Sequence, residues 1–291
     1  MTSNVLCKEI VSKRGDFMKV IKLLLTTALL SYCSHFAMAS DNADLCQEGD
    51  TSCTFMLLSE LTTLNNSNTN NINSVNEKRA NTPLSPFSTF KVANSLIGLD
   101  LGVIKNIKQE LTYNETAYSQ QAWWPSVWKL PYYDLTTAFK FSMVAIYRQL
   151  ATDIGEQNME NYLGKLQYGN QDISSGLDSF WLNGSMKISA VEQVNFLKNM
   201  YHNSFGLNEK AIDNLKNVML AETKPNYRLY AKTGAGKTDD KIILGWYIGF
   251  VENSSGVHFF AFNFDSPTFA EMKAKRIKLA KNYLRQADII K

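Results

Sequence analysis

The chain has 291 residues, 45% of them hydrophobic and 20% charged, which is enough for one large folded domain or one domain divided into two lobes. Its formal net charge of +3 comes from the N-terminal segment, because residues 1–39 hold five basic and two acidic side chains and the rest of the chain holds 25 of each sign. A mature chain without net charge gives no support to a nucleic-acid partner or to binding at an anionic membrane surface.

Residues 1–39 are typical of a leader that is removed on export. Translation is expected to start at Met18, and a basic beginning, an apolar centre over 23–30 and small residues up to Ala39 follow. The apolar run is shorter than a stable membrane span requires, so we expect no stable membrane anchor. These features predict export, a periplasmic location and one mature domain over residues 40–291.

Cys46 and Cys53 are the cysteines that remain in the predicted mature chain. In an oxidising compartment they could close a short disulfide loop, but two unpaired thiols near the N-terminus fit the sequence equally well. Their spacing is not that of a metal cluster, and no other group of His, Cys or carboxylate residues has ligand spacing. We therefore expect no metal site.

The first half of the mature chain contains one predicted strand followed by predicted helices. Residues 54–61 form an apolar run that predicts a strand, whereas the asparagine-rich residues 65–73 predict a surface turn or loop. A buried helix is expected from Ser88, because apolar residues recur at helical spacing: Phe90, Ala93, Leu96 and Ile97. Ser189 and Glu192 form a capping box that predicts the start of a later helix.

The C-terminal part changes to the period of strands. Residues 228–233, 242–252 and 257–264 predict three strands, and a final helix should bury one face: Ile277, Ala280, Leu284 and Ala287. This order predicts an α/β (α+β) fold in which helices flank one antiparallel sheet built from both ends of the chain. The expected sheet lobe is formed by residues of about 50–85 and 215–291, and an inserted all-helical lobe by about 86–214.

The stretch AKTGAGKT, residues 231–238, has two interpretations. Its end resembles a phosphate-binding loop, but that motif requires glycine where Ala231 stands and a helix after it, whereas residues 242–251 are apolar and β-branched. The nucleotide interpretation fails on both counts. The other interpretation is a K-T-G strand triplet, Lys232-Thr233-Gly234, which belongs to enzymes that use a serine nucleophile.

Such an enzyme needs an activated serine, and Ser88 and Lys91 form an S-x-x-K motif. Positions three apart lie on one helix face, so the Lys91 amine can reach the Ser88 hydroxyl. A lysine serves as a base only when uncharged, and burial among apolar groups such as Phe90 and Leu96 favours that form. Alone, the motif is more often a capping serine beside a solvated lysine.

Further motifs make the joint pattern specific. They follow in order as Ser142-Met143-Val144, Tyr168-Gly169-Asn170, an F-W-L segment with Trp181, and the K-T-G triplet. The chain resembles the class D (oxacillinase-type) serine β-lactamases from about Phe55 to Ile290. This resemblance implies a serine β-lactamase or penicillin-binding transpeptidase-like fold and a small-molecule β-lactam substrate. The Y-G-N and F-W-L segments distinguish it from class A enzymes.

The resemblance also implies a role for each motif residue. Ser88 would attack the lactam carbonyl, and Lys91, carboxylated by CO₂ and with no other cofactor, would be the general base for acylation and deacylation. Trp181 would hydrogen-bond the added carboxyl group, and Val144 would keep its pocket dry. Ser142 would relay a proton to the lactam nitrogen.

The remaining roles concern the substrate. The N–H groups of Ser88 and Ala235 would form the oxyanion hole. Lys232, counted among the catalytic residues, would face the substrate carboxylate together with Thr233. Substrate binding would fall to Tyr168, Asn170, Thr233, Gly234 and Arg276.

Simpler interpretations exist for several of these residues: Trp181 and Val144 as core packing, Tyr168 and Asn170 as turn formers, Arg276 as a solvated helix residue. The chain also departs from the family at residues 111–120, at the aromatic residues 122–134 and at Ala145, where proline is frequent. These departures bear on substrate preference.

We therefore predict hydrolysis of β-lactams through an acyl-enzyme on Ser88. Two alternatives share the same fold: a β-lactam sensor domain and a penicillin-binding D,D-peptidase, both of which acylate without rapid turnover. A histidine-based hydrolase is disfavoured, because His202 and His258 accompany no nucleophile-elbow motif. The expected assembly is a monomer or homodimer.

Overall fold

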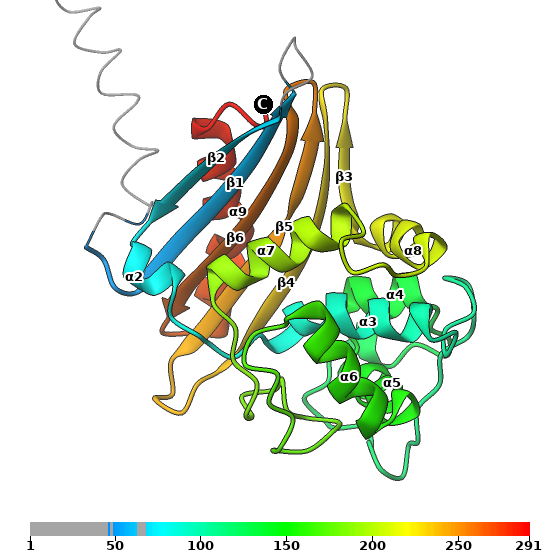
Figure 1. Ribbon diagram of the computed structural model, residues 1–291. Helices are drawn as coiled ribbons and strands as arrows, with labels where there is room; N and C mark the ends of the chain where they lie inside the picture. The colour runs from blue at the N-terminus through cyan, green and yellow to red at the C-terminus, as the bar shows by residue number, and fades with distance from the viewer. Residues whose placement is uncertain (1–45, 47–48, 63–67) are drawn as a thin grey trace, which may run out of the picture. The chain divides into compact units, whose positions relative to one another are not determined.

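The computed structural model describes residues 46, 49–62 and 68–291 (Figure 1). The predicted leader and its cleavage site lie outside these residues. Cys46 and Cys53 form a disulfide, which decides between the two alternatives that the sequence left open. Within the described part, no helix combines the length and the apolar character needed to cross a membrane.

Six strands form one antiparallel sheet in the order β2-β1-β6-β5-β4-β3. Their bounds are β1 Cys53–Thr62, β2 Asn68–Val75, β3 Leu220–Lys224, β4 Tyr227–Lys237, β5 Ile243–Asn253 and β6 Gly256–Ser266. The first strand and the three C-terminal strands are thus confirmed. Because β1 pairs with β6, strands from the N-terminal and the C-terminal parts of the described chain meet in one sheet, as predicted.

Strand β2 corrects the prediction of a turn or loop over residues 65–73. Residues 68–75 pair with β1 at the outer edge of the sheet, and residues 63–67 lie outside the described part. Asn71, Ile72, Asn73 and Ser74 are exposed there. An edge strand is held by main-chain hydrogen bonds to one neighbour, so it forms without the apolar side chains on which the prediction depended.

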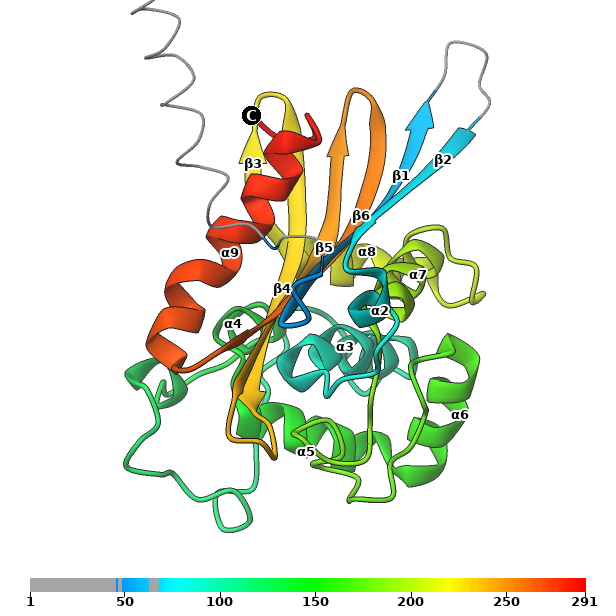
Figure 2. The same cartoon turned by 90° about the vertical axis from the view of Figure 1, so that its left-hand side faces the viewer.

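Helices cover both faces of the sheet. The bounds are α2 Glu77–Ala80, η1 Phe87–Phe90, α3 Lys91–Asp100, η2 Ser126–Trp128, α4 Leu135–Phe141, α5 Val144–Ile154, α6 Glu156–Leu166, α7 Ala190–Tyr201, α8 Glu209–Met219 and α9 Phe269–Gln286, where η is a 3-10 helix. Helix α9 packs on β5 and β6 from one side, and α7 packs on β1, β5 and β6 from the other (Figure 2). Helix α5 packs on α3 and α6, and α8 packs on α3 and α4. The exact division into two lobes stays a prediction.

Two helix predictions can be compared in detail. The capping box of Ser189 and Glu192 at the start of α7 is confirmed. For α9 the expected face is only half right, because Ala280 and Leu284 are buried but Ile277 is 39% exposed. The helix ends before Ala287. Its buried face instead runs through residues that fit the sheet surface: Met272, Leu279, Ala280, Tyr283 and Leu284.

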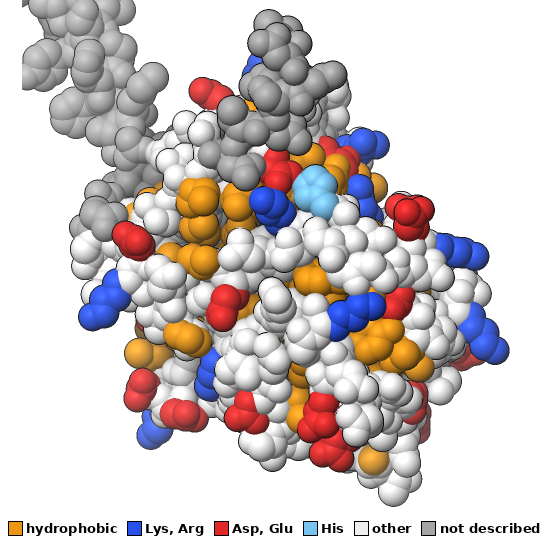
Figure 3. All heavy atoms as spheres, in the orientation of Figure 1, with side chains coloured by type: hydrophobic (Ala, Val, Ile, Leu, Met, Phe, Trp, Pro, Cys, Tyr) orange, Lys and Arg blue, Asp and Glu red, His pale blue; other side chains and the backbone are white. Residues whose placement is uncertain are grey.

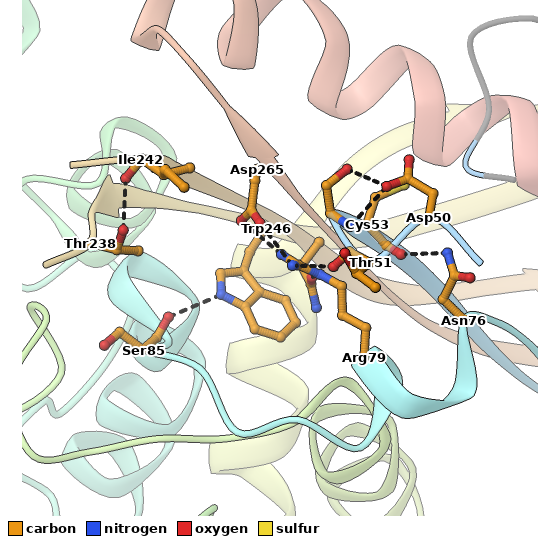
Figure 4. Close-up of polar contacts among 12 residues, drawn as sticks. Asp50, Thr51, Cys53, Asn76, Arg79, Ser85, Thr238, Ile242, Trp246 and Asp265 are labelled. Atoms are coloured by element: carbon orange, nitrogen blue, oxygen red, sulfur yellow. Dashed lines mark hydrogen bonds and ion pairs between the residues drawn. The ribbon is translucent and has the colours of Figure 1, made fainter. Parts of the chain in front are cut away.

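The segment between α2 and Ser88 is fastened to the sheet at both ends (Figure 4). Arg79 makes a bidentate ion pair with Asp265 at 2.8 Å and donates to the carbonyl of Thr51 at 2.9 Å. Closer to Ser88, the indole of Trp246 on β5 donates to the carbonyl of Ser85 at 3.0 Å. These bonds fix the approach of the chain to η1.

The 3-10 helix η1 lies directly against β4. A Cβ at Gly234 would come within 2.8 Å of the Pro86 carbonyl oxygen and 2.9 Å of Thr89 Cγ2, and a Cβ at Gly236 would overlap the Phe87 ring. The two glycines therefore allow the strand and the turn to approach more closely than side chains would permit. Phe87 itself has a positive φ of 49°.

Basic and acidic side chains are interspersed over the face shown in Figure 3. This mixture agrees with the balanced charge expected for the mature chain. It gives that face the character of an ordinary solvated surface.

Gly236→Ala should lower the free energy of unfolding by about 1–3 kcal/mol, because the new methyl group displaces the Phe87 ring from a packed contact. Chemical denaturation measures the change. Gly164→Ala on α6 is the matched control: its Cβ would meet only Gln171 Oε1 at 3.7 Å, and alanine favours a helix. Equal stability of the Gly236 variant and wild type would contradict the close packing of η1 on β4.

Candidate active site

Ser88 and Lys91 meet at the junction of η1 and α3. The Lys91 amine donates to the Ser88 hydroxyl at 3.0 Å. Ser88 lies within a 3-10 turn, in which side chains three apart are eclipsed, so S-x-x-K spacing brings the two groups together. Ser88 is half-buried and accessible, whereas Lys91 is fully buried behind it.

The surroundings of Lys91 are apolar and aromatic. Its amine lies over the Tyr147 ring, 4.9 Å from the centroid, and the neighbouring Phe90, Val92 and Leu96 are fully buried. Burial penalises the charged form and lowers the pKa of Lys91 from 10.5 to about 7. A large fraction of the amine is therefore uncharged near neutral pH.

Ser142 lies at a break between two helices. It ends α4 in the left-handed conformation, with φ 54° and ψ 41°, and α5 starts two residues later at Val144. The break turns the hydroxyl toward β4, where Lys232 Nζ donates to it at 2.5 Å. Periodicity did not reveal this break because both flanking segments are helical and apolar.

Lys232 is the second buried lysine of the site. Its pKa is lowered well below the usual value, first by burial and then by the positive charges of Lys91 and Arg276. The amine also donates to the Thr233 carbonyl at 2.9 Å. One site thus combines side chains from three motifs that are spread over residues 88–234 of the chain. S-x-x-K supplies Ser88 and Lys91, S-x-V supplies Ser142, and K-T-G supplies Lys232.

The K-T-G triplet lies on a part of β4 that β3 does not cover. Along β4, pairing with β3 covers Tyr227 to Tyr230 and ends there. The part of β4 after Tyr230 has no β3 neighbour, and η1 packs against β4. Ala235 continues this edge opposite Gly245 of β5. Arg276 on α9 donates to the Gly234 carbonyl at 2.8 Å, and burial lowers its pKa to about 10.

Trp181 and Val144 have different surroundings. Trp181 is fully buried and stacks on Phe90 with ring centroids 5.1 Å apart, yet its indole nitrogen is a buried donor without a hydrogen-bond partner. Val144 lines a cavity of about 320 Å³ whose other wall includes Trp123 and Trp128. The Trp128 indole donates to the carbonyl of residue 141, so the unusual aromatic segment lies next to Ser142.

Tyr168 and Asn170 are placed in supporting positions. Tyr168 is fully buried against Phe90, so its ring does not line an open cleft. The Asn170 side chain accepts from the Lys187 N–H and donates to the Ser185 carbonyl, both at 2.9 Å, and so fastens a turn. No hydrogen bond or ring contact described for these two side chains reaches Ser88. A substrate-binding role for them stays a prediction.

A hollow of about 430 Å³ adjoins the site between α4, the end of α8 and β4. Lys232 and Thr233 line it, whereas Ser88 does not. Sequence motifs gave no signal for the other walls, which include Phe139, Lys140, Tyr247 and Ile277. These residues come from three separate elements, α4, β5 and α9, so only the fold shows that they share one surface. No group of three His, Cys, Asp or Glu residues in the described part of the chain is placed to hold a metal.

Comparisons with known proteins agree with this geometry. Residues 58–287 match the penicillin binding protein transpeptidase domain. Beta-lactamase OXA-48 of Klebsiella pneumoniae is 40% identical over 204 residues, 70% of this chain and 74% of that protein. Beta-lactamase OXA-10 of Pseudomonas aeruginosa is 38% identical over 180 residues, 61% and 65% of the two chains.

Solved structures give the same result. FUS-1 (OXA-85), a class D β-lactamase from Fusobacterium nucleatum subsp. polymorphum, has a TM-score of 0.72 and 31% sequence identity, and the match covers 82% of this chain and 93% of that chain. The chain therefore belongs to the penicillin-binding transpeptidase family and, within it, to the class D, OXA-type serine β-lactamases.

The buried Lys91 makes a prediction about folding stability. Folding lowers the pKa of Lys91 from 10.5 to about 7. At a pH between these two values, Lys91 is protonated in the unfolded chain but largely unprotonated in the folded chain. The free energy of unfolding should therefore rise with pH, by roughly 2 kcal/mol from pH 7 to 9 from this residue. Urea denaturation in CO₂-depleted buffer measures it.

Lys91→Met is the control, since it fills a similar volume without a titrating group. Its stability should depend less steeply on pH than that of wild type over the same range. Lys232 contributes a slope of the same sign in both proteins, because its pKa is also lowered. Parallel curves for the two proteins would show that Lys91 is not desolvated.

Proposed function

We propose that this chain hydrolyses β-lactam antibiotics through an acyl-enzyme on Ser88. The observation that carries the proposal is the fully buried amine of Lys91, 3.0 Å from a half-buried serine hydroxyl. Ser88 Oγ attacks the lactam carbonyl carbon, the carbon–nitrogen bond of the ring breaks, and the nitrogen takes up a proton. Water then attacks the resulting ester, which releases the ring-opened acid and returns the hydrogen to Ser88.

We also propose that Lys91 carries a carboxyl group derived from CO₂. Only an uncharged amine reacts with CO₂, and burial provides that form near pH 7. The unpartnered indole N–H of Trp181 is a buried donor that suits an anionic oxygen in this pocket. When present, the carboxyl group supplies a proton acceptor for both the acylation and the deacylation step.

Ser142 and Lys232 are suited to deliver the proton to the lactam nitrogen. Their hydrogen bond joins a hydroxyl, which both accepts and donates, to a lysine that burial and two neighbouring positive charges make a weaker base. A proton that leaves Lys232 can therefore pass through Ser142. Thr233 lies on β4, and Arg276 reaches the same strand from α9 by donating to the Gly234 carbonyl. These two residues are the proposed partners of the substrate carboxylate.

The oxyanion hole is proposed from the main-chain N–H groups of Ser88 and Ala235. The two residues belong to η1 and to the uncovered edge of β4, which pack directly on each other. Main-chain donors held by two packed elements need little reorganisation as negative charge develops on the carbonyl oxygen. Export to the periplasm after removal of residues 1–39 belongs to the same proposal.

The sensor and the D,D-peptidase remain the alternative functions, since both share S-x-x-K and K-T-G. Val144 in the S-x-V motif and the unpartnered indole of Trp181 favour hydrolysis. A D,D-peptidase typically carries S-x-N where this chain has Ser142-Met143-Val144.

Purified protein should turn over many equivalents of a chromogenic cephalosporin, since the site holds groups for acylation and for release. Added bicarbonate should raise the rate, and Lys91→Ala should abolish it because the base is lost. The number of equivalents consumed per enzyme is the measurement.

Ser88→Ala serves as the control and should form no acyl adduct in mass spectrometry. A single stoichiometric burst by the wild type would overturn hydrolysis in favour of the sensor or the peptidase.

Trp181→Phe tests the carboxylated lysine. Losing one hydrogen bond to an anionic group should lower turnover by about 10- to 100-fold. It should also weaken the carbamate signal in ¹³C NMR of protein equilibrated with ¹³C-bicarbonate, and excess bicarbonate should restore part of both. Trp123→Phe, at an indole that is 71% exposed, is the control. An undiminished carbamate signal in the Trp181 variant would show that the Trp181 indole does not stabilise the carboxyl group on Lys91.

A further inference from the structure

Thr89, the residue after the proposed nucleophile, is held by a side chain from a distant helix. Gln193 on α7 donates through Nε2 to Thr89 Oγ1 at 2.8 Å, and both side chains are fully buried. The Thr89 hydroxyl in turn donates to the Pro86 carbonyl at 2.8 Å. The three groups form a short chain of hydrogen bonds that runs from α7 through η1.

Thr89 is also the residue against which β4 packs. A Cβ at Gly234 would come within 2.9 Å of Thr89 Cγ2 and 3.1 Å of Thr89 N. Thr89 therefore lies between Gln193 on one side and the K-T-G edge on the other. Because α7 packs on β1, β5 and β6, the hydrogen bond from Gln193 ties η1 to an element fixed by the sheet.

Packing alone does not account for glutamine at this place. The Gln193 carbonyl oxygen is buried without a partner, which costs free energy that an apolar side chain of the same length would avoid. The Tyr168 hydroxyl is also buried without a hydrogen-bond partner of normal geometry. Burial raises the pKa of Tyr168, and the nearby Thr89 and Gln193 side chains lower it in part. Among the described residues, Thr89 is thus the side-chain partner to which Gln193 makes a hydrogen bond of normal geometry.

We propose that Gln193 is a positioning residue for Ser88. By fixing the rotamer of Thr89, it sets the orientation of the η1 turn and with it the Ser88 hydroxyl and N–H relative to β4. This role rests on the proposed acylation of Ser88. It predicts an effect on the rate of bond formation rather than on substrate binding, because Gln193 is buried away from the substrate.

The test compares Gln193→Met, Thr89→Val and the double variant in stopped-flow acylation by a chromogenic cephalosporin. Gln193→Met should acylate about 10- to 100-fold more slowly with little change in KM, since a small misplacement of a reacting group has effects of this size. Thr89→Val removes the same hydrogen bond, so the double variant should be no slower than the slower single variant. Gln157→Met on the exposed face of α6 is the matched control.

Gln193→Glu provides a readout that loss of packing would not change. When its carboxyl group is protonated, which burial favours, it can donate to Thr89 as the amide does; when ionised, it cannot. Its acylation rate relative to wild type should therefore fall as pH rises. This variant decides the matter if Gln193→Met fails to fold.

The outcomes separate the two proposals. A wild type that forms no acyl adduct overturns the proposed function itself. A wild type that acylates while Gln193→Met acylates equally fast, or while the effects of Gln193→Met and Thr89→Val are additive, overturns the positioning role alone. A constant ratio for Gln193→Glu across pH would do the same.

Discussion

The site depends on one constraint: the amine of Lys91 is buried without a counter-ion. In water a lysine stays charged near neutral pH, and a neighbouring carboxylate would keep it so inside a protein. Within residues 46, 49–62 and 68–291, no salt bridge joins a carboxylate to Lys91 or Lys232. Desolvation therefore acts unopposed, and the positive charges of Lys91 and Arg276 add to it at Lys232.

This constraint explains why the site is assembled from three segments of chain. A single helix can place Ser88 and Lys91 together but cannot enclose the amine, which requires the ring of Tyr147 from α5. The break at Ser142 and the uncovered edge of β4 then bring a hydroxyl and a second lysine to the open side. The sheet matters because it holds β4 at van der Waals distance from η1, through positions where glycine is required.

The sequence predicted those features in which the signal is local. Apolar spacing located α3 and strands β4 to β6. The order of the motifs identified the four polar residues of the site, Ser88 with Lys91 and Ser142 with Lys232. It failed where the cause is tertiary. Strand β2 exists because β1 offers it a partner. The left-handed turn at Ser142 separates α4 from α5, and the apolar period of the two helices does not show where one ends. Gln193 carried no motif, since its partner Thr89 lies 104 residues away.

The unpartnered indole N–H of Trp181 connects the fold to the chemistry. A buried donor without an acceptor costs about 1–3 kcal/mol. The Trp181 ring packs against both Phe90 and Phe180, and its carbonyl accepts from the N–H of Phe87. Phenylalanine could fill much of this volume without that cost. A tryptophan here is best explained by an acceptor that the amino-acid chain does not itself provide. Under the proposed carboxylation, the carboxyl group on Lys91 would supply one, and its negative charge would then be stabilised by the indole.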